Sequence, residues 1–356
     1  MAVHGSPLSS SPALLTPPVA DRGPEMLAAL DLGTNNCRLL VARVCPDGFE
    51  IVDSFSRIVR LGEGVAASGR LAEGAMARTL AALRVCARIM GRHGVRRARC
   101  VATEACRRAV NGAAFLARVR RATGLRFEIL AREEEANLAL LGCLPLIDPE
   151  ARQILVVDIG GGSTAVVWLD RAAVGGVAPT AAAYQIALSL PCGVVSLSEA
   201  FGRDAADDAT FEAMVGHVSA ALGRAGAAGR IAPRLAAEAG LQMLGTSGTV
   251  TTLAALHLGL PRYDRRRVDG IELDFSAIDA VSRALRRMDN AARAAHPCIG
   301  QGRADLVIAG CAILEAVHRC WPAARLRVAD RGVREGILHA LIGRSLGGPP
   351  GRAGAS

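Results

Sequence analysis

Hydrophobic and polar residues form the same series of patterns in the two halves of the chain. In the first half, three alternating runs within residues 26–61 predict three strands joined by short turns. Residues 72–92 repeat hydrophobic positions at helical spacing, with Met76, Leu80 and Leu83 on one face. The patterns that follow predict a strand at 98–102, a helix at 113–122, a strand at 127–130 and a helix at 133–143.

The second half follows the same plan after residues 145–150, whose Pro and Asp residues predict a hinge between two domains. A triplet of strands followed by alternating helices and strands is typical of an α/β fold, here present twice. The predicted elements are strands at 154–158, 165–170 and 183–189, a helix at 208–239, a strand at 242–244, helices at 250–257, 276–289 and 303–320, a strand at 325–328 and a helix at 333–343.

The two ends of the chain differ in composition from the rest. Residues 1–25 are rich in Ser, Pro and Ala, lack the features of a signal peptide and predict a disordered tail. We expect a first domain over 26–147, a second over 148–344 and a second disordered tail over 345–356. The last helix could pack back on the first domain.

The charge of the chain favours a polyanionic partner. The net charge is +9, and all 42 basic residues are Arg, since the sequence contains no Lys. A general bias in composition explains this charge about equally well, because net charge alone constrains partners weakly. The absence of Lys has a firmer consequence. It excludes Walker A, Schiff-base and kinase-type lysine chemistry.

The cysteines and the hydrophobic runs indicate a cytoplasmic protein. The ten cysteines form no C-x-x-C pair and are typical of small buried residues in a reducing compartment. No apolar run reaches transmembrane length, so we expect no membrane association. The seven histidines are dispersed, which does not favour a His-based metal site.

One motif occurs in both halves of the chain. Asp31–Asn36 and Asp158–Thr164 each place an Asp at the end of a strand, directly before a glycine turn and another strand. Glycine lets the backbone approach a ligand and expose its N–H groups. Two such turns facing one cleft would hold a phosphate chain between them, with an Asp on each side for a metal ion.

Three further segments carry candidate chemistry. Gly245–Thr249 runs from a strand into a helix, so it could bind an anion or simply cap the helix through a hydroxyl. Arg107 follows a strand and is either a phosphate clamp or an ordinary surface arginine. Glu133–Glu135 opens a helix, where carboxylates are favoured by the helix dipole, or where one could act as a general base.

Together these segments resemble the exopolyphosphatase and guanosine pentaphosphate phosphohydrolase family, of the actin–hexokinase–chaperone superfamily. The resemblance spans about residues 26–343 and indicates the short, two-domain form. It implies duplicated actin-like (ribonuclease H-like) α/β domains, each with a mixed five-stranded sheet and flanking helices, and an active site between them. The motifs that carry it are Ala29–Arg38, Ala102–Asn111, Ile129–Gly142, Val156–Thr164, Leu190–Glu199, Leu244–Thr251 and Val328–Gly336.

The resemblance assigns roles to residues of this chain. It implies that Glu135 is the catalytic base and that Asp158 is linked to Mg²⁺ or another divalent cation. The matching place of Asp31 in the first motif makes it a candidate to share the metal. It places phosphate binding at both glycine turns, Arg107 and the third turn. The residues concerned are Asp31, Gly33, Thr34, Asn35, Asn36, Arg107, Gly160, Gly161, Gly162, Ser163, Thr164, Ser247, Gly248 and Thr249.

Two positions depart from the family pattern. Ala165 stands where the family usually has a Glu implicated in the metal site, which puts metal affinity and activity in question. Asn36 stands where Ser or Thr is commoner, a milder change because Asn still forms hydrogen bonds.

The function implied is metal-dependent hydrolysis of the terminal phosphate of inorganic polyphosphate, with release of orthophosphate. Hydrolysis of the 5′-phosphate of guanosine pentaphosphate at the same site is the nearest alternative. Because of Ala165, a non-catalytic polyphosphate- or alarmone-binding protein remains a second, and a sugar kinase relative is a distant third. The resemblance also implies a homodimer, and we expect no nucleic acid partner.

Overall fold

The computed structural model describes residues 24–170, 186–202, 206–226 and 241–346. The predicted tails, up to residue 23 and from residue 347, lie outside the described residues. The same holds for parts of two predicted elements, the start of the strand at 183–189 and the end of the helix at 208–239.

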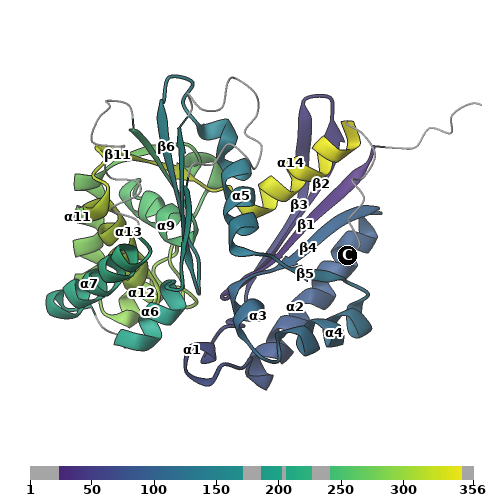
Figure 1. Ribbon diagram of the computed structural model, residues 1–356, viewed down its shortest axis with the longest axis horizontal. Helices are drawn as coiled ribbons and strands as arrows, with labels where there is room; N and C mark the ends of the chain where they lie inside the picture. The colour runs from purple at the N-terminus through teal and green to yellow at the C-terminus, as the bar shows by residue number, and fades with distance from the viewer. Residues whose placement is uncertain (1–23, 171–185, 203–205, 227–240, 347–356) are drawn as a thin grey trace, which may run out of the picture.

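The first domain contains a sheet of five strands in the order β3-β2-β1-β4-β5, shown in purple and blue in Figure 1. Strands β1, β2 and β3 form an antiparallel meander, and β4 and β5 are parallel to β1. The strands are β1 (Met26–Leu32), β2 (Asn36–Cys45), β3 (Gly48–Ile58), β4 (Arg97–Ala102) and β5 (Phe127–Ile129). The helices are α1 (Val65–Ser68), α2 (Glu73–Arg92), α3 (Glu104–Arg108), α4 (Gly112–Thr123) and α5 (Arg132–Cys143), with a 3₁₀ turn at Leu144–Leu146.

The described residues of the second domain form six strands, in the order β10-β11-β9-β6-β7-β8, where five were predicted. The additional strand, β10 (Glu272–Asp274), is too short to show a hydrophobic alternation in the sequence. The other strands are β6 (Gln153–Ile159), β7 (Thr164–Asp170), β8 (Ile186–Leu190), β9 (Leu241–Thr246) and β11 (Arg325–Ala329). The helices are α6 (Val194–Phe201), α7 (Asp208–Arg224), α9 (Gly248–His257), α10 (Arg265–Val268), α11 (Phe275–Arg287), α12 (Asn290–Ala295), α13 (Val307–Cys320) and α14 (Val333–Leu346).

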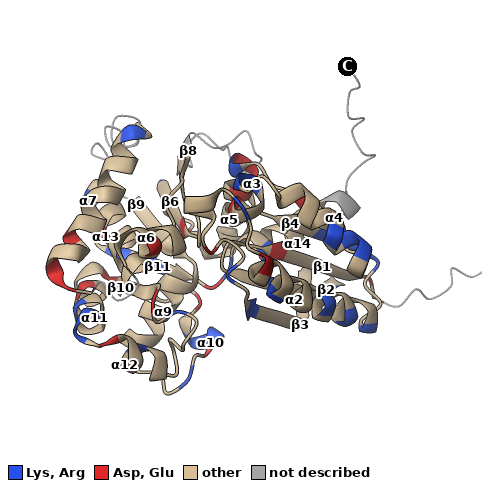
Figure 2. Ribbon diagram, turned by 90° about the horizontal axis from the view of Figure 1, so that it is seen from below, with Lys and Arg blue, Asp and Glu red and all other residues tan. Residues whose placement is uncertain are grey.

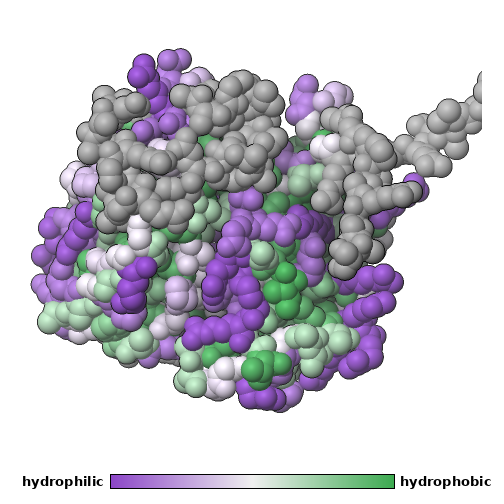
Figure 3. All heavy atoms as spheres, viewed as in Figure 1, coloured by the Kyte–Doolittle hydropathy of each residue, from purple (hydrophilic) through white to green (hydrophobic). Residues whose placement is uncertain are grey.

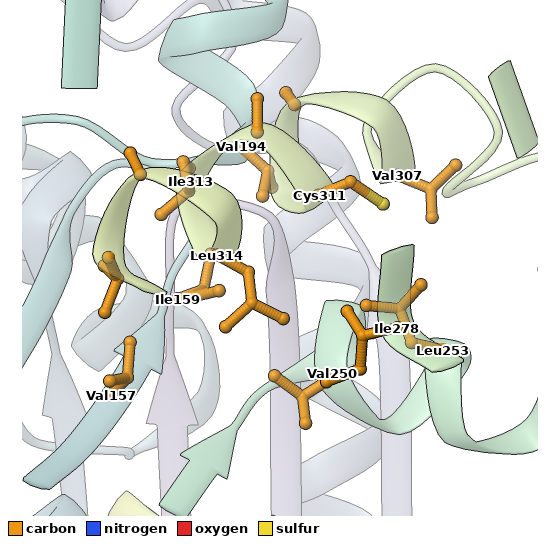
Figure 4. Close-up of a cluster of buried hydrophobic side chains, with 14 of the residues drawn as sticks. Val157, Ile159, Val194, Val250, Leu253, Ile278, Val307, Cys311, Ile313 and Leu314 are labelled. Carbon is orange, nitrogen blue, oxygen red and sulfur yellow. The ribbon is translucent and has the colours of Figure 1, made fainter. Parts of the chain in front are cut away.

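Helices α9, α11 and α13 bury the sheet of the second domain under an aliphatic core. Figure 4 shows Val157 and Ile159 of β6 among side chains such as Val250 of α9 and Leu314 of α13. Burying one such side chain contributes about 1.5–3 kcal/mol, so this core holds β6 and the turn after it in place.

Helices α5 and α14 lie between the two sheets, with α14, in yellow, along β1 and β2 (Figure 1). Leu138 of α5 and Ile337 of α14 pack with β1, while Leu140 of α5 packs against the second sheet. The two helices approach closely because a Cβ on Gly336 would lie 1.9 Å from the carbonyl oxygen of Leu138. The N-terminal turns of both helices therefore reach the space between the domains.

Candidate active site

The two repeated glycine turns have the same local structure. In the first, the backbone N–H of Gly33 donates to the carbonyl oxygen of Asn36 at 2.9 Å, and in the second, Gly160 donates to Ser163 at 2.9 Å. Each turn joins two antiparallel strands, as the sequence predicted. The Asp before each turn, Asp31 or Asp158, therefore lies at the same place in its domain.

The two turns touch each other across the domain boundary. A Cβ on Gly162 would lie 2.7 Å from Oγ1 of Thr34, and a Cβ on Gly161 would lie 3.0 Å from Thr34 Cβ. Gly193 supports the second turn from behind, since a Cβ there would lie 2.5 Å from the backbone of Gly161. Only glycine fits these approaches, which explains the glycine run in the sequence.

A cavity of about 440 Å³ lies between the domains and collects most of the predicted site residues. Two predicted residues, Arg107 and Thr164, are not among those that line it. The predicted residues that line it are Asp31, Gly33, Thr34, Asn35, Asn36, Glu135, Asp158, Gly160, Gly161, Gly162, Ser163, Ser247, Gly248 and Thr249.

Of the three glutamates that open α5, Glu135 lines the cavity. Glu134 instead forms an ion pair with Arg99, and Glu133 is exposed. Burial raises the pKa of Glu135 to about 7; Arg107 opposes this, and the nearby charges of Asp158 and Asp31 add to it. A carboxyl group with this pKa can accept a proton near neutral pH.

Arg107 lies behind Glu135 and is held by protein groups. Its Nη2 donates to Oε2 of Glu104 at 2.6 Å and to Oε2 of Glu135 at 3.1 Å, and its Nη1 donates to the carbonyl oxygen of Leu130. In this structure its guanidinium therefore orients the candidate base. Thr164 is also engaged, since its buried hydroxyl donates to the carbonyl oxygen of Cys192 at 2.7 Å.

Asn35 is a buried polar residue that lines the cavity. The residue is 8% exposed, and within the described part of the chain its Oδ1 has no hydrogen-bond partner. Its backbone is fixed, because its carbonyl oxygen accepts from the N–H groups of Val59 and Arg60 at 2.8 and 3.0 Å. The buried Oδ1 can therefore accept a hydrogen bond from a donor that a bound water or ligand brings.

The third turn combines a cap with a strained backbone. The side chain of Ser247 accepts from the N–H of Thr249 at 3.3 Å, so the ordinary capping role is present. Ser247 also has a φ of 127°, a region that side chains rarely adopt. Ser247 and the start of α9 also line the cavity.

The two aspartates fit a divalent cation. Both line the cavity, burial raises the pKa of Asp158 to about 6, and the charge of Asp31 adds to that rise against the opposing effect of Arg38. No group of three or more His, Cys, Asp or Glu residues among the described ranges could hold a metal by itself. Mg²⁺ needs no such cage, because it binds one or two carboxylates together with water and substrate phosphates.

Several cavity residues were missed by the sequence analysis. Arg38 lies directly opposite Asp31 across β1 and β2, and Ala165 lies opposite Asp158 at the matching place. Arg38 follows Asp31 by the same number of residues as Ala165 follows Asp158, so a comparison of the two hairpins could have identified Arg38. Arg334 could not be found this way, because it reaches the cavity through α14. The other missed residues include Ser54, Ser56, Thr103, Thr251, Thr252, Tyr263, Arg265, Arg303, Asp330, Arg331 and Glu335.

Comparisons with known proteins identify a family for this chain. A model of the Ppx/GppA phosphatase family matches residues 40–345. Exopolyphosphatase 2 of Mycobacterium tuberculosis is 32% identical over 333 residues, which cover 89% of this chain and 98% of that protein. The crystal structure of an exopolyphosphatase-like protein aligns with this chain at a TM-score of 0.79 and 31% sequence identity. The crystal structure of the Aquifex aeolicus Ppx/GppA family member aligns at a TM-score of 0.73 and 28% identity. Each alignment covers 91% of this chain and 99% of the other protein.

Proposed function

The chain belongs to the Ppx/GppA phosphatase family, and from this premise we propose that its cleft removes the terminal phosphate of inorganic polyphosphate as orthophosphate. The observation that carries this proposal is Glu135 in one cavity with both glycine turns and both aspartates. The relative from Mycobacterium tuberculosis, named an exopolyphosphatase, supports the choice of substrate. The two-domain α/β fold expected from the resemblance is confirmed.

Glu135 accepts a proton from the attacking water in the proposed reaction. The water oxygen forms a bond to the terminal phosphorus, the bridging P–O bond breaks, and the shortened polyphosphate leaves. The pKa of about 7 keeps a useful fraction of Glu135 ionised at neutral pH. Arg107 fixes the position of this carboxylate through the 3.1 Å hydrogen bond.

The glycine turns hold the phosphate that is removed. The residues of both turns line the cavity, so their remaining backbone N–H groups, the Nδ2 of Asn35 and the hydroxyl of Ser163 could donate to phosphoryl oxygens as negative charge develops on them. Asp31 and Asp158 would hold Mg²⁺. When bound, the ion would neutralise charge on the phosphate oxygens.

Guanosine pentaphosphate is the second candidate substrate. The cavity continues from the glycine turns past the start of α9 to Tyr263 and Arg303, which leaves space beyond the terminal phosphate. A nucleoside could occupy this space while the same turns hold its 5′-phosphates. The alternative of a binding protein without turnover rests on Ala165, which supplies no carboxylate beside Asp158.

The test is release of orthophosphate from long-chain polyphosphate by the purified protein, with Mg²⁺ and with EDTA. We expect release with Mg²⁺ and none with EDTA. Competition with guanosine pentaphosphate on the same assay separates the two substrates. Binding without release would favour the non-catalytic alternative, and release in EDTA would contradict the role given to Mg²⁺.

Partners and compartment stay predictions. No helix among the described residues is both long enough and apolar enough to cross a bilayer. The face in Figure 3 mixes hydrophilic and hydrophobic residues, and within the described ranges Val110 and Ile129 are the exposed large hydrophobic side chains, at 74% and 39%. We continue to propose a homodimer and a cytoplasmic location from the resemblance and the cysteine pattern.

A further inference from the structure

Two arginines line the cavity without an ion pair. Arg38 comes from β2 and Arg334 from the first turn of α14. In the part of the chain that the structure describes, neither guanidinium forms a hydrogen bond or a salt bridge. Arg38 faces the same side of the sheet as Asp31, since the two are paired across β1 and β2.

These two arginines line the same cavity as Asp31, and their charges act on it. Both act to lower the pKa of Asp31, against burial, which raises it. Burial lowers the pKa of Arg334, and the charge of Arg38 adds to that effect. Two like charges held together at a partly buried place are unfavourable unless an anion lies between them.

Other charged residues of the cavity already have partners within the protein. Arg265 donates to Glu335 at 2.8 Å, and Arg331 donates to Asp269 at 2.8 Å. Helix α10, which carries Arg265, also carries the exposed Arg266 and Arg267 and is coloured blue in Figure 2. Arg303, which precedes α13 in the chain, lies beside Gly248 at the start of α9 and donates to Oγ1 of Thr252 at 3.3 Å. Arg38 and Arg334 are therefore the cavity arginines without a hydrogen-bond partner among the described residues, and they lie where the cavity meets the first sheet.

A row of polar residues continues from Arg38 toward the edge of the first sheet. Ser56 is paired with Arg38 across β2 and β3, and Ser54 is paired with Leu40. Both serines are exposed and line the same cavity. Their hydroxyl groups can donate to phosphate oxygens without needing a charge.

We propose that Arg38 and Arg334 bind the second phosphate of the substrate, next to the one removed, and that further phosphates follow Ser56 and Ser54 along β3. This subsite rests on the proposed function and deepens it, since it selects a linear polyphosphate over a single phosphate group. A guanidinium pair fits phosphate because each fork can donate two parallel hydrogen bonds.

Calorimetric titration with tripolyphosphate and with orthophosphate tests the subsite. It is carried out in a Glu135→Gln background, so that affinity is measured without turnover. We expect Arg334→Gln to weaken tripolyphosphate binding by roughly tenfold or more, the usual effect of losing a charged hydrogen bond. Orthophosphate, which needs only the glycine turns, should bind that variant as before. Arg38→Gln should also weaken tripolyphosphate binding.

Two other variants control for charge and for folding. Arg325→Gln removes the same charge from an exposed arginine that pairs with Asp274, and it should leave both affinities unchanged. If Arg334→Gln does not fold, Arg334→Lys replaces it. Lys keeps the positive charge but lacks the paired N–H donors of the guanidinium, so we expect Arg334→Lys to bind tripolyphosphate more weakly than the parent protein does.

Three results would overturn the subsite. Tripolyphosphate affinity could survive both Arg38→Gln and Arg334→Gln, or orthophosphate and tripolyphosphate could weaken equally in Arg334→Gln. Loss of tripolyphosphate binding in Arg303→Gln alone would instead place the chain over α9. Failure of the proposed function is a different outcome, namely wild-type protein that binds tripolyphosphate but releases no orthophosphate.

Discussion

Ala165 lies directly opposite Asp158 across β6 and β7, where Arg38 lies opposite Asp31 in the other hairpin. The two halves of the site therefore share a backbone arrangement but differ in charge. Residues paired in this way have Cβ atoms about 4.5–5.5 Å apart and point to the same face of the sheet. A longer side chain at 165 would meet Asp158.

Ala165→Glu should strengthen metal binding. A carboxylate at this position adds a second negative charge beside Asp158, so we expect the Mg²⁺ concentration for half-maximal activity to fall by about tenfold, equivalent to about 1.4 kcal/mol. In EDTA the same variant should have a lower Tm than wild type, because the carboxylates repel each other. Ala165→Gln is the control of equal size. Equal effects of Glu and Gln on the Mg²⁺ requirement would contradict this reading.

Arg107→Gln should move the acid limb of the pH profile. The charge of Arg107 lowers the pKa of Glu135, whereas burial raises it. Without it the pKa of Glu135 rises above about 7, and the limb of kcat/KM should shift to higher pH by about one unit. Arg132→Gln is a matched control, since Arg132 pairs with Glu104 and not with Glu135. If the acid limb of the kcat/KM profile stays at the same pH in Arg107→Gln, Arg107 does not set the pKa of the catalytic base.

Glu135→Gln should stabilise the protein at alkaline pH when no metal is present. The pKa of Glu135 rises from 4.5 to about 7 on folding, so its contribution to stability is complete below pH 4.5 and is lost as the pH rises through 7. Above pH 7 the wild type carries a buried charge that the variant lacks. We expect a higher Tm for Glu135→Gln at pH 8 and a smaller difference at pH 4.5. Glu133→Gln, an exposed neighbour on the same turn, should change neither value.

The ion pair of Arg60 with Asp305 joins the first glycine turn to the second domain. Nη2 of Arg60 lies 2.8 Å from Asp305 Oδ1, and the backbone N–H of Arg60 donates to Asn35. Ser198 of α6 donates to the carbonyl oxygen of Asp305 at 2.7 Å. Breaking this pair should loosen the contact between the two turns.

We expect Arg60→Met and Asp305→Asn each to lower kcat/KM for polyphosphate by roughly tenfold, as a partly buried pair that loses one partner would. The double variant should be no worse than the poorer single variant, because both remove one interaction. Arg319→Met, which breaks an exposed pair with Glu212 inside the second domain, should have no such effect. Additive losses in the double variant would show that the two residues act separately.

The sequence predicted the parts of the fold and the site that depend on local patterns. The hairpins around Asp31 and Asp158 could be identified because strand, glycine turn and strand follow each other within a few residues. The glutamates at 133–135 could be noted because they open a helix after a short strand, and the family resemblance singled out Glu135 among them. These local signals, with the family resemblance, were sufficient for the fold class, which is confirmed.

Features that depend on contacts distant in sequence could not be predicted. Arg107 was expected to face phosphate, whereas its guanidinium lies against Glu104 and Glu135, a position set by how α3 and α5 pack. Arg334 enters the cavity because α14 returns to the first sheet, at a glycine contact between α14 and α5. No pattern within either segment carries that information.

The most direct test of the account is orthophosphate release from long-chain polyphosphate by wild-type protein and by Glu135→Gln, measured at pH 8 with Mg²⁺, with polyphosphate affinity measured on the same samples. The account predicts steady release by the wild type, a loss of about 10²-fold or more in Glu135→Gln, and equal affinities. Release by Glu135→Gln at the wild-type rate would contradict it and would remove Glu135 from the mechanism.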